Sequence, residues 1–79
     1  MNKEIFIKCL NSIHTDKDIT DVNIIMEKDD MYYFEIYYIE NDMKIYSPAL
    51  HSLYKSTYEH FESLENLKDT KRKIDNINE

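Results

Sequence analysis

Glycine and tryptophan are absent from this 79-residue chain, which also has only one proline and one cysteine. Without glycine it cannot form a glycine-rich loop that cradles phosphates, because such loops need residues without side chains. The shortage of glycine and proline also argues against a β fold with many turns. A single cysteine, Cys9, excludes an internal disulfide framework and fits a reducing compartment.

Long apolar segments are missing as well. No run approaches the about 18 apolar residues of a membrane-spanning helix, and Glu4 and Lys8 interrupt the first ten residues. We therefore expect no signal peptide and a soluble protein of the cytoplasm. With 42% hydrophobic residues, the chain is too apolar for a disordered protein, so residues 1–79 are expected to form a single small domain.

Negative charge is concentrated in the middle of the chain. The formal net charge is −6, and residues 16–42 alone hold nine carboxylates against two lysines, a net −7. These acids are Asp16, Asp18, Asp21, Glu27, Asp29, Asp30, Glu35, Glu40 and Asp42. Such a field repels nucleic acid and attracts basic protein surfaces. A role in solubility alone is the alternative interpretation.

Hydrophobic periodicity predicts the secondary structure. Phe6, Leu10 and Ile13 share one stripe, which predicts a helix over residues 3–13, with Asn2 as its N-cap. After a polar connection over 14–21, strands are expected at 22–26, 31–39 and 43–46. The turns at 27–30 and 41–42 are short, and short connections imply an antiparallel meander.

A second helix is expected to begin at Ser47-Pro48, because serine is a good N-cap and proline fits the first helical position. Its end, about residues 74–79, is expected to fray. The predicted fold is therefore α+β: a three-stranded antiparallel meander with an N-terminal and a long C-terminal helix packed on one face, in the order α-β-β-β-α. The predicted core is Phe6, Leu10, Ile24, Phe34, Ile36, Leu50, Leu53, Phe61 and Leu64.

The longest predicted strand, MYYFEIYYIE at 31–40, is apolar on both faces. Side chains alternate along a strand, so one face carries Tyr32, Phe34, Ile36 and Tyr38, and the other carries Tyr33, Glu35, Tyr37 and Ile39. Two helices cover only one side of such a sheet. We expect the second set to form a contact surface bordered by Glu35, Glu40, Asp29, Asp30 and Asp42. Cross-strand aromatic pairing that only stabilises the sheet is the alternative.

The second helix offers another candidate surface. Tyr58, Glu62, Glu65 and Asp69 follow one another at i, i+4, i+7 and i+11, so three carboxylates line one ridge. This ridge is either a solvated face or an imitation of the spaced charges of a nucleic-acid backbone. The basic run Lys68–Lys73 is interpreted as favourable charge at a helix end.

Catalytic and metal-binding patterns are weak. His51 and His60 are nine residues apart on the predicted second helix, and His14 ends the first, so no metal-pair spacing occurs. The acids after Asp16 resemble a calcium loop only faintly, because Asp21 stands where that loop needs glycine. We expect no enzyme activity, no catalytic residues, no cofactor and no bound metal.

In its small size, its many Asn, Lys and Ile residues, its acidity and its predicted element order, the chain resembles small phage-encoded inhibitors of host defence of the anti-CRISPR type. The resemblance covers residues 3 to about 70 in architecture and charge, and no residue motif carries it. It implies a non-enzymatic inhibitor that occludes the nucleic-acid-binding site of a basic partner protein, such as an effector nuclease, without itself binding nucleic acid or membrane. The alternatives are a homo-oligomeric assembly protein using the open sheet face, and a toxin-neutralising immunity or antitoxin protein.

Overall fold

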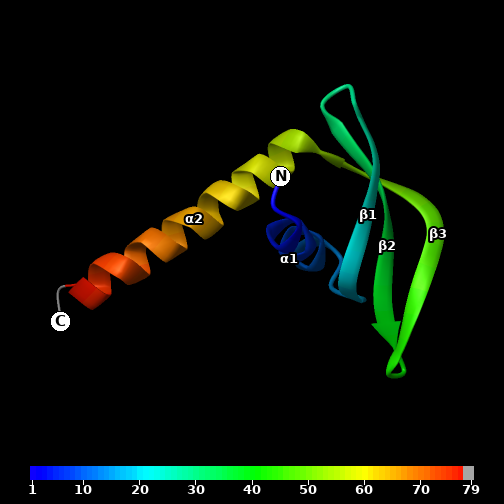
Figure 1. Cartoon of the computed structure of the whole chain (residues 1–79), viewed down its shortest axis with the longest axis horizontal. Helices are drawn as coiled ribbons and strands as arrows, with labels where there is room; N and C mark the ends of the chain where they lie inside the picture. Colours follow the sequence, from blue (N-terminus) through cyan, green and yellow to red (C-terminus); the bar gives the residue numbers. More distant parts are fainter. Residues whose placement is uncertain (78–79) are drawn as a thin grey trace.

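The computed structural model describes residues 1–77, with side chains described as far as Lys68. Helix α1 (Lys3–Ile13) precedes strands β1 (Asp18–Lys28), β2 (Met31–Glu40) and β3 (Met43–Tyr54), and helix α2 (Lys55–Ile77) follows. The three strands form one antiparallel sheet in the order β1-β2-β3. The predicted α+β class and the α-β-β-β-α order are confirmed (Figure 1).

Helix α1 has the predicted bounds, and its cap explains why it starts where it does. The side chain of Asn2 accepts a hydrogen bond from the backbone N–H of Ile5, which satisfies one of the free donors of the first turn. The helix buries Phe6, Cys9 and Leu10, the stripe expected from the sequence. Ile13, also placed on that stripe, is 49% exposed because it lies at the last position of the helix.

Two-residue turns without glycine connect the strands. Asp29 and Asp30 have φ values of 53° and 61°, and Asn41 and Asp42 have values of 51° and 62°. Two successive positive φ angles are what a tight hairpin turn requires, and Asp and Asn tolerate this region better than other residues with side chains. A chain without glycine can therefore still build two tight hairpins.

The predicted boundary at Ser47-Pro48 is wrong. Strand β3 continues to Tyr54, and α2 begins only at Lys55. Proline is accepted here because β3 is an edge strand and its pairing with β2 shifts register next to Pro48, between the pairs Ile36↔Ser47 and Phe34↔His51. The spacing of leucines after this point suggested a helix, but Leu50 and Leu53 are strand residues.

Strand β1 is also longer than predicted. It starts at Asp18, inside the segment expected to be a polar connection, and it buries both Ile19 and Val22. The expected start at 22 was late because Thr20 and Asp21 separate these two apolar residues by three positions. The register shift between Ile19 and Asp21 accounts for this spacing, since an extra residue restores both side chains to the same face.

The core lies between α1 and the sheet. Phe6 is at its centre, with ring centroids 5.1 Å from Phe34 and 5.5 Å from Tyr32, both edge-to-face. The buried cluster is Phe6, Leu10, Ile19, Val22, Tyr32, Phe34, Ile36 and Tyr58, with Cys9 buried beside Leu10 in α1.

Four of the nine predicted core residues are fully buried: Phe6, Leu10, Phe34 and Ile36. Ile24 and Leu53 pack partly buried against them, and Phe61 is half-buried. Leu50 and Leu64 are 58% and 44% exposed, so their assignment to the core is wrong. The reason is that Leu50 lies in the irregular part of β3 and Leu64 lies beyond the first turns of α2, which are the turns that reach the core.

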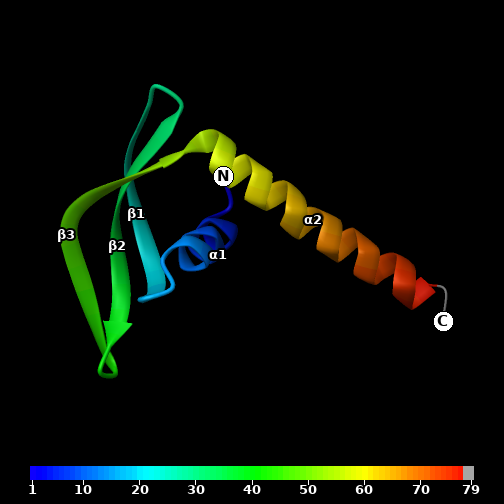
Figure 2. The same ribbon diagram turned by 180° about the vertical axis from the view of Figure 1, so that it is seen from behind.

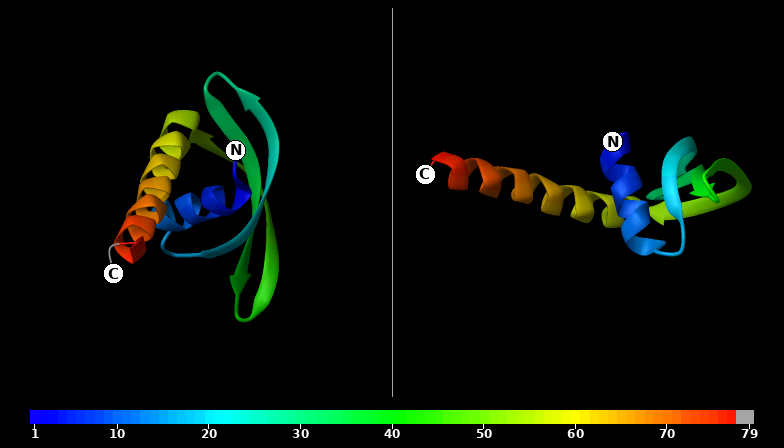
Figure 3. Two further views of the ribbon diagram at one scale, coloured as in Figure 1. Left: turned by 60° about the vertical axis from the view of Figure 1, so that its left-hand side comes forward. Right: turned by 90° about the horizontal axis from the view of Figure 1, so that it is seen from below.

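Both helices lie on the same side of the sheet, but only α1 lies along it (Figures 1 and 2). Helix α2 contacts α1 and the end of β3 and then runs away from the sheet (Figure 3). The radius of gyration, 14.9 Å, exceeds the about 12 Å expected for a compact chain of this length. The helix is regular as far as Ile77, and the expected fraying over 74–79 stays a prediction, with residues 78–79 outside the described part.

Candidate protein-interaction surface

The face of the sheet turned away from α1 is defined by β2. Tyr33, Glu35, Tyr37 and Ile39 alternate with the buried Tyr32, Phe34 and Ile36, as the sequence predicts. The register adds the cross-strand partners on the same side. We call this surface the open face: Asp18, Asp21, Asn23, Met26, Met31, Tyr33, Glu35, Tyr37, Ile39, Lys44, Tyr46, Ser52 and Tyr54.

Contacts between strands fix the side chains of the open face. The rings of Tyr37 and Tyr46 are 5.3 Å apart, and the Lys44 ammonium lies 5.2 Å from the centre of the Tyr37 ring. The hydroxyl of Tyr46 donates a short hydrogen bond to the Glu35 carboxylate, which also accepts one of 3.4 Å from the Asn23 amide. The bond to Glu35 raises the pKa of the Tyr46 hydroxyl. These contacts therefore hold the rings of Tyr37 and Tyr46 in place.

Glu35 is not at the border of this surface, as the sequence suggested, but between its tyrosines. Its neighbours on β2, two positions away in each direction, are Tyr33 and Tyr37. The correction follows from alternation, because a residue in the middle of the strand cannot lie at a rim. Glu35 consequently accepts a hydrogen bond from Tyr46 and holds that ring in the middle of the surface.

The remaining predicted acids form two separate acidic tips. Asp29 and Asp30 make the β1–β2 turn, and Glu40 and Asp42 lie at the β2–β3 turn. All four are exposed, and the two turns lie at opposite ends of the sheet (Figure 1). Ten residues of β2 separate them, which corresponds to about 33 Å of extended strand. The continuous acidic rim expected from the sequence is thus two clusters with the tyrosines between them.

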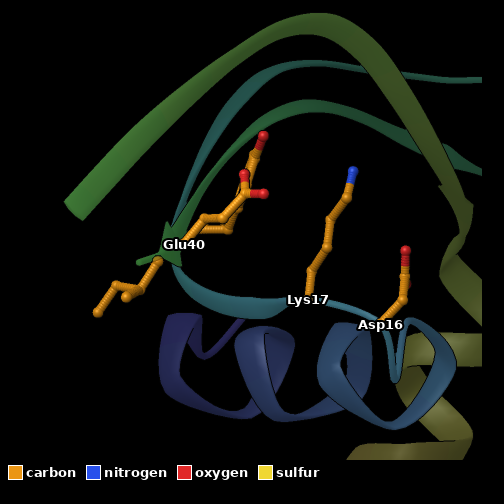
Figure 4. A pocket seen from close by; sticks show the side chains of 5 residues that line it. Asp16, Lys17 and Glu40 are labelled. Atoms are coloured by element: carbon orange, nitrogen blue, oxygen red, sulfur yellow. The ribbon is translucent and has the colours of Figure 1, made fainter. Parts of the chain in front are cut away.

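A shallow hollow adjoins one acidic tip. Asp16 and Lys17 rise from the segment before β1, and Tyr38, Ile39 and Glu40 complete the lining (Figure 4). The Lys17 ammonium lies 5.0 Å from the centre of the Tyr38 ring. At about 240 Å³ the hollow is smaller than the about 300–1,000 Å³ of ordinary small-molecule sites. We therefore treat it as a shallow depression beside the β2–β3 turn.

The predicted helix ridge does not face solvent. Tyr58 is only 2% exposed, with its ring 5.6 Å from Phe6 and 5.9 Å from Tyr32. Its hydroxyl donates a short hydrogen bond to Glu62 and accepts one of 2.8 Å from the backbone N–H of Asn2. Burial, followed by the bond to Glu62, raises the pKa of Tyr58. This residue joins α2 to α1 and the core.

Glu62 and Glu65 follow Tyr58 on the same side of α2 and are half-buried. Glu65 approaches Lys8 of α1 at 3.9 Å and Lys68 at 3.4 Å. The assignment as an exposed ridge is wrong because i, i+4, i+7 spacing from a buried tyrosine places these carboxylates toward α1. The side chain of Asp69 lies outside the described residues.

Sequence reasoning missed Tyr54 and underused Tyr46, which are 60% and 46% exposed. Tyr54 was assigned to a helix, and Tyr46 was placed at the end of a short strand. The signal was available in the sequence, since alternation continued past Pro48 brings Ser52 and Tyr54 to the same side as Tyr46. The register shift there preserves the alternation, because β3 advances four residues, from Ser47 to His51, where β2 advances two.

Burial shifts the pKa values of both His51 and Cys9. His51 lies on β3, not on a helix as predicted, with its ring stacked 5.8 Å from Phe34 and 6.4 Å from His14. Burial lowers the pKa of His51, and His14 and Lys17 add to this effect. Burial raises the pKa of Cys9, which is the opposite of what an activated thiol needs.

Within the part of the chain that the structure describes, no three His, Cys, Asp or Glu side chains are grouped so that they could hold a metal ion. Over the same residues, no helix combines the length and apolarity needed to cross a lipid bilayer. Compared with protein-family models, curated proteins and solved structures, the chain matches none of them.

Proposed function

We propose that this chain is a non-enzymatic binding protein whose open face docks on a basic surface of a partner protein and thereby blocks that surface for nucleic acid. The observation that carries the proposal is a fixed row of tyrosines, uncovered by any described helix, lying between two acidic tips. An effector nuclease of host defence is the class of partner that the resemblance in architecture and charge implies, and a toxin is the other.

The tyrosines support the binding part of the proposal. Tyrosine is enriched among the residues that contribute most to protein–protein affinity, and a ring that is already held loses little entropy on binding. Tyr37, Tyr46 and Glu35 hold one another across β2 and β3. A stabilising role for these pairs, the alternative above, is compatible with this use, because the exposed edges of the rings remain free for contact.

The acidic tips support the choice of partner. A protein groove that binds nucleic acid is lined with lysine and arginine side chains that neutralise the phosphates. The tips would meet those cations while the uncharged rings lie over the middle. Steering by this field raises the association rate more than it slows dissociation.

Pairing of two open faces, the homo-oligomeric alternative, is less favoured by the same geometry. Antiparallel or parallel stacking of two such sheets brings acidic tips of one copy near those of the other. Like charges at that distance repel unless salt screens them. Light scattering of Tyr37→Glu checks this alternative: a dimer that becomes a monomer while keeping its circular dichroism spectrum would support homotypic pairing through the open face.

The test compares two double variants with the same net charge. Asp30→Asn with Asp42→Asn removes one charge from each tip, and asparagine keeps the positive φ that both turns need. Glu4→Gln with Glu59→Gln removes two exposed charges from the helices. Both bring the formal charge from −6 to −4.

Partners are captured on the immobilised wild type from cells of the organism in which the protein acts, and are then challenged with duplex DNA and RNA. The proposal expects nucleic acid to displace the captured protein, and the tip variant to associate about tenfold more slowly at low salt than the helix variant. If nucleic acid and this protein bind the partner together, or if the two variants behave alike, the proposed function is wrong.

A further inference from the structure

The ammonium group of Lys44 lies over the ring of Tyr37 in the middle of the open face. The distance from Nζ to the centre of the ring is 5.2 Å, within the about 6 Å at which the negative face of an aromatic ring attracts a cation. Tyr37 is half-buried, whereas Lys44 is exposed, so the lysine can leave the ring for water without disturbing the sheet. The Tyr37 ring therefore already binds a cation, and that cation belongs to the chain itself.

Two carboxylates lie beside this ring. Asp21 is directly opposite Tyr37 on β1, and Glu35 precedes Tyr37 by two positions on β2, so all three side chains share the open face. Both carboxylates are half-buried. The pKa of Asp21 is lowered, chiefly by its hydrogen bond with Lys3 and to a smaller extent by the charge of Lys44. We call this group of Tyr37, Asp21 and Glu35 the Tyr37 site.

The carboxylates of the Tyr37 site can accept further hydrogen bonds. The Lys3 ammonium and the backbone N–H that follows Asp21 both contact the same oxygen of Asp21, Oδ1, at 2.8 Å each. The two oxygens of Glu35 accept one bond each, from Tyr46 and Asn23. Since a carboxylate has about four acceptor positions, each of the two retains about two for another donor.

We propose that the Tyr37 site binds an arginine side chain of the basic partner protein, which takes the place of Lys44 over the ring. This inference rests on the proposed function, because the arginine is one of the cations of the surface that is blocked. Arginine fits better than lysine, since a planar guanidinium stacks on an aromatic ring while its N–H groups donate to carboxylates at its edge. Lys44 presents only a point charge that stays in water. Displacing it costs a factor of only about two to five in affinity, the usual size of an exposed cation–π contact.

NMR titrations of the full chain with tetra-arginine and tetralysine peptides test the inference. The two peptides carry the same charge, so attraction to the acidic tips acts on both alike. We expect the wild type to bind the arginine peptide more tightly and the ring signals of Tyr37 and Tyr46 to move. Tyr37→Ile removes the ring from the strand and should abolish the preference for arginine. Equal affinity of the wild type for the two peptides, or an unchanged preference in Tyr37→Ile, would overturn the inference.

A second pair of variants tests the displacement of Lys44. Lys44→Gln empties the ring and should bind the arginine peptide about two- to fivefold more tightly than Lys17→Gln, as measured on the Tyr37 ring signals. Lys17→Gln is the matched control, because it also changes the formal charge from −6 to −7 and also removes a lysine from a tyrosine ring. That ring, of Tyr38, lies 5.0 Å from the Lys17 ammonium and belongs to the other face of the sheet. Equal affinities of the two variants would show that arginine does not replace Lys44.

The peptide titrations and the competition with nucleic acid fail independently. A protein that competes with nucleic acid for its partner but binds both peptides alike would overturn the arginine site and leave the proposed function standing. A protein that prefers the arginine peptide but binds its partner together with nucleic acid would overturn the proposed function and leave the arginine site standing.

Discussion

The two faces of the sheet are both aromatic, and they differ in what surrounds the rings. On the covered face Tyr32 and Phe34 meet Phe6 edge-to-face, and the only α2 tyrosine there, Tyr58, has its hydroxyl satisfied by Glu62 and Asn2. On the open face the rings contact one another and charged side chains instead. One alternating strand thus supplies the core with one set of side chains and leaves the other set available for contact.

The largest effect should come from the covered face. Phe34→Ala removes a ring that is 1% exposed and in contact with Phe6, so the free energy of unfolding should fall by about 3–5 kcal/mol. For a domain whose whole margin is of the order of 5–15 kcal/mol, much of the protein would then unfold. Urea denaturation measures this change. Loss of less than about 1 kcal/mol would mean that Phe34 is not central to the core.

A smaller effect is expected at the junction of α2 with the core. Tyr58→Phe keeps the ring but removes the hydrogen bonds to the Glu62 carboxylate and the Asn2 N–H, at a cost of about 0.5–1.5 kcal/mol, because both groups can then reach water. Tyr54→Phe, on an exposed tyrosine, is the control and should be nearly neutral. Equal denaturation midpoints for the two variants would show that the Tyr58 hydroxyl does not stabilise the fold.

The protein should become less stable in acid because His51 on β3 must then take up a proton. The pKa of His51 is lowered in the folded protein below its ordinary value of 6.5, chiefly by burial and then by His14 and Lys17. The unfolded chain therefore binds more protons than the folded one just below pH 6.5, so stability is full above that pH and falls as the solution is acidified.

The buried Nε2 of His51 has no hydrogen-bond partner among the described residues, so the folded state offers nothing to hold an added proton there. Melting curves between pH 7.5 and pH 5.5 check this prediction against His51→Phe, which keeps a ring on Phe34. The wild type should lose more stability than the variant over this range. Identical pH profiles would exclude His51 as the cause.

The smallest effect on stability is expected on the open face. Tyr37→Ala removes the contacts with Tyr46 and Lys44, together worth about 1 kcal/mol or less at an exposed site. Binding to a captured partner should fall much more than stability does. A variant that loses stability and binding in proportion would mean that Tyr37 serves the sheet and not a contact surface.

The sequence is informative where one local signal acts alone. The stripe of α1, the N-cap at Asn2 and the alternation of β2 are each sufficient, and the structure confirms all three. Prediction failed where two signals competed. Ser47-Pro48 has the chemistry of a helix start, but pairing with β2 and a register shift beside the proline keep this segment in the sheet.

Local signals also predicted only part of the candidate surface. The open-face residues of β2 were predictable, since alternation within one strand is local. The position of Glu35 between Tyr33 and Tyr37 also follows from alternation, whereas its hydrogen bonds to Tyr46 and Asn23 depend on the pairing of three strands, which spacing along the chain does not encode. The burial of Tyr58 was missed because its spacing with three carboxylates suggested an exposed face. Its contacts with Phe6, Tyr32 and Asn2 join residues far apart in the sequence.

The measurement that tests the central claim most directly is a set of NMR spectra of the tyrosine rings, recorded with and without a captured partner. The signal of each tyrosine ring responds to contacts on the one face of the sheet where that ring lies. Backbone signals respond to changes on either face. The account predicts that the ring signals of Tyr33, Tyr37 and Tyr46 shift or broaden as partner is added, while those of the buried Tyr32 and Tyr58 stay in place. Unchanged open-face rings in a formed complex would contradict the claim that this face is the docking surface.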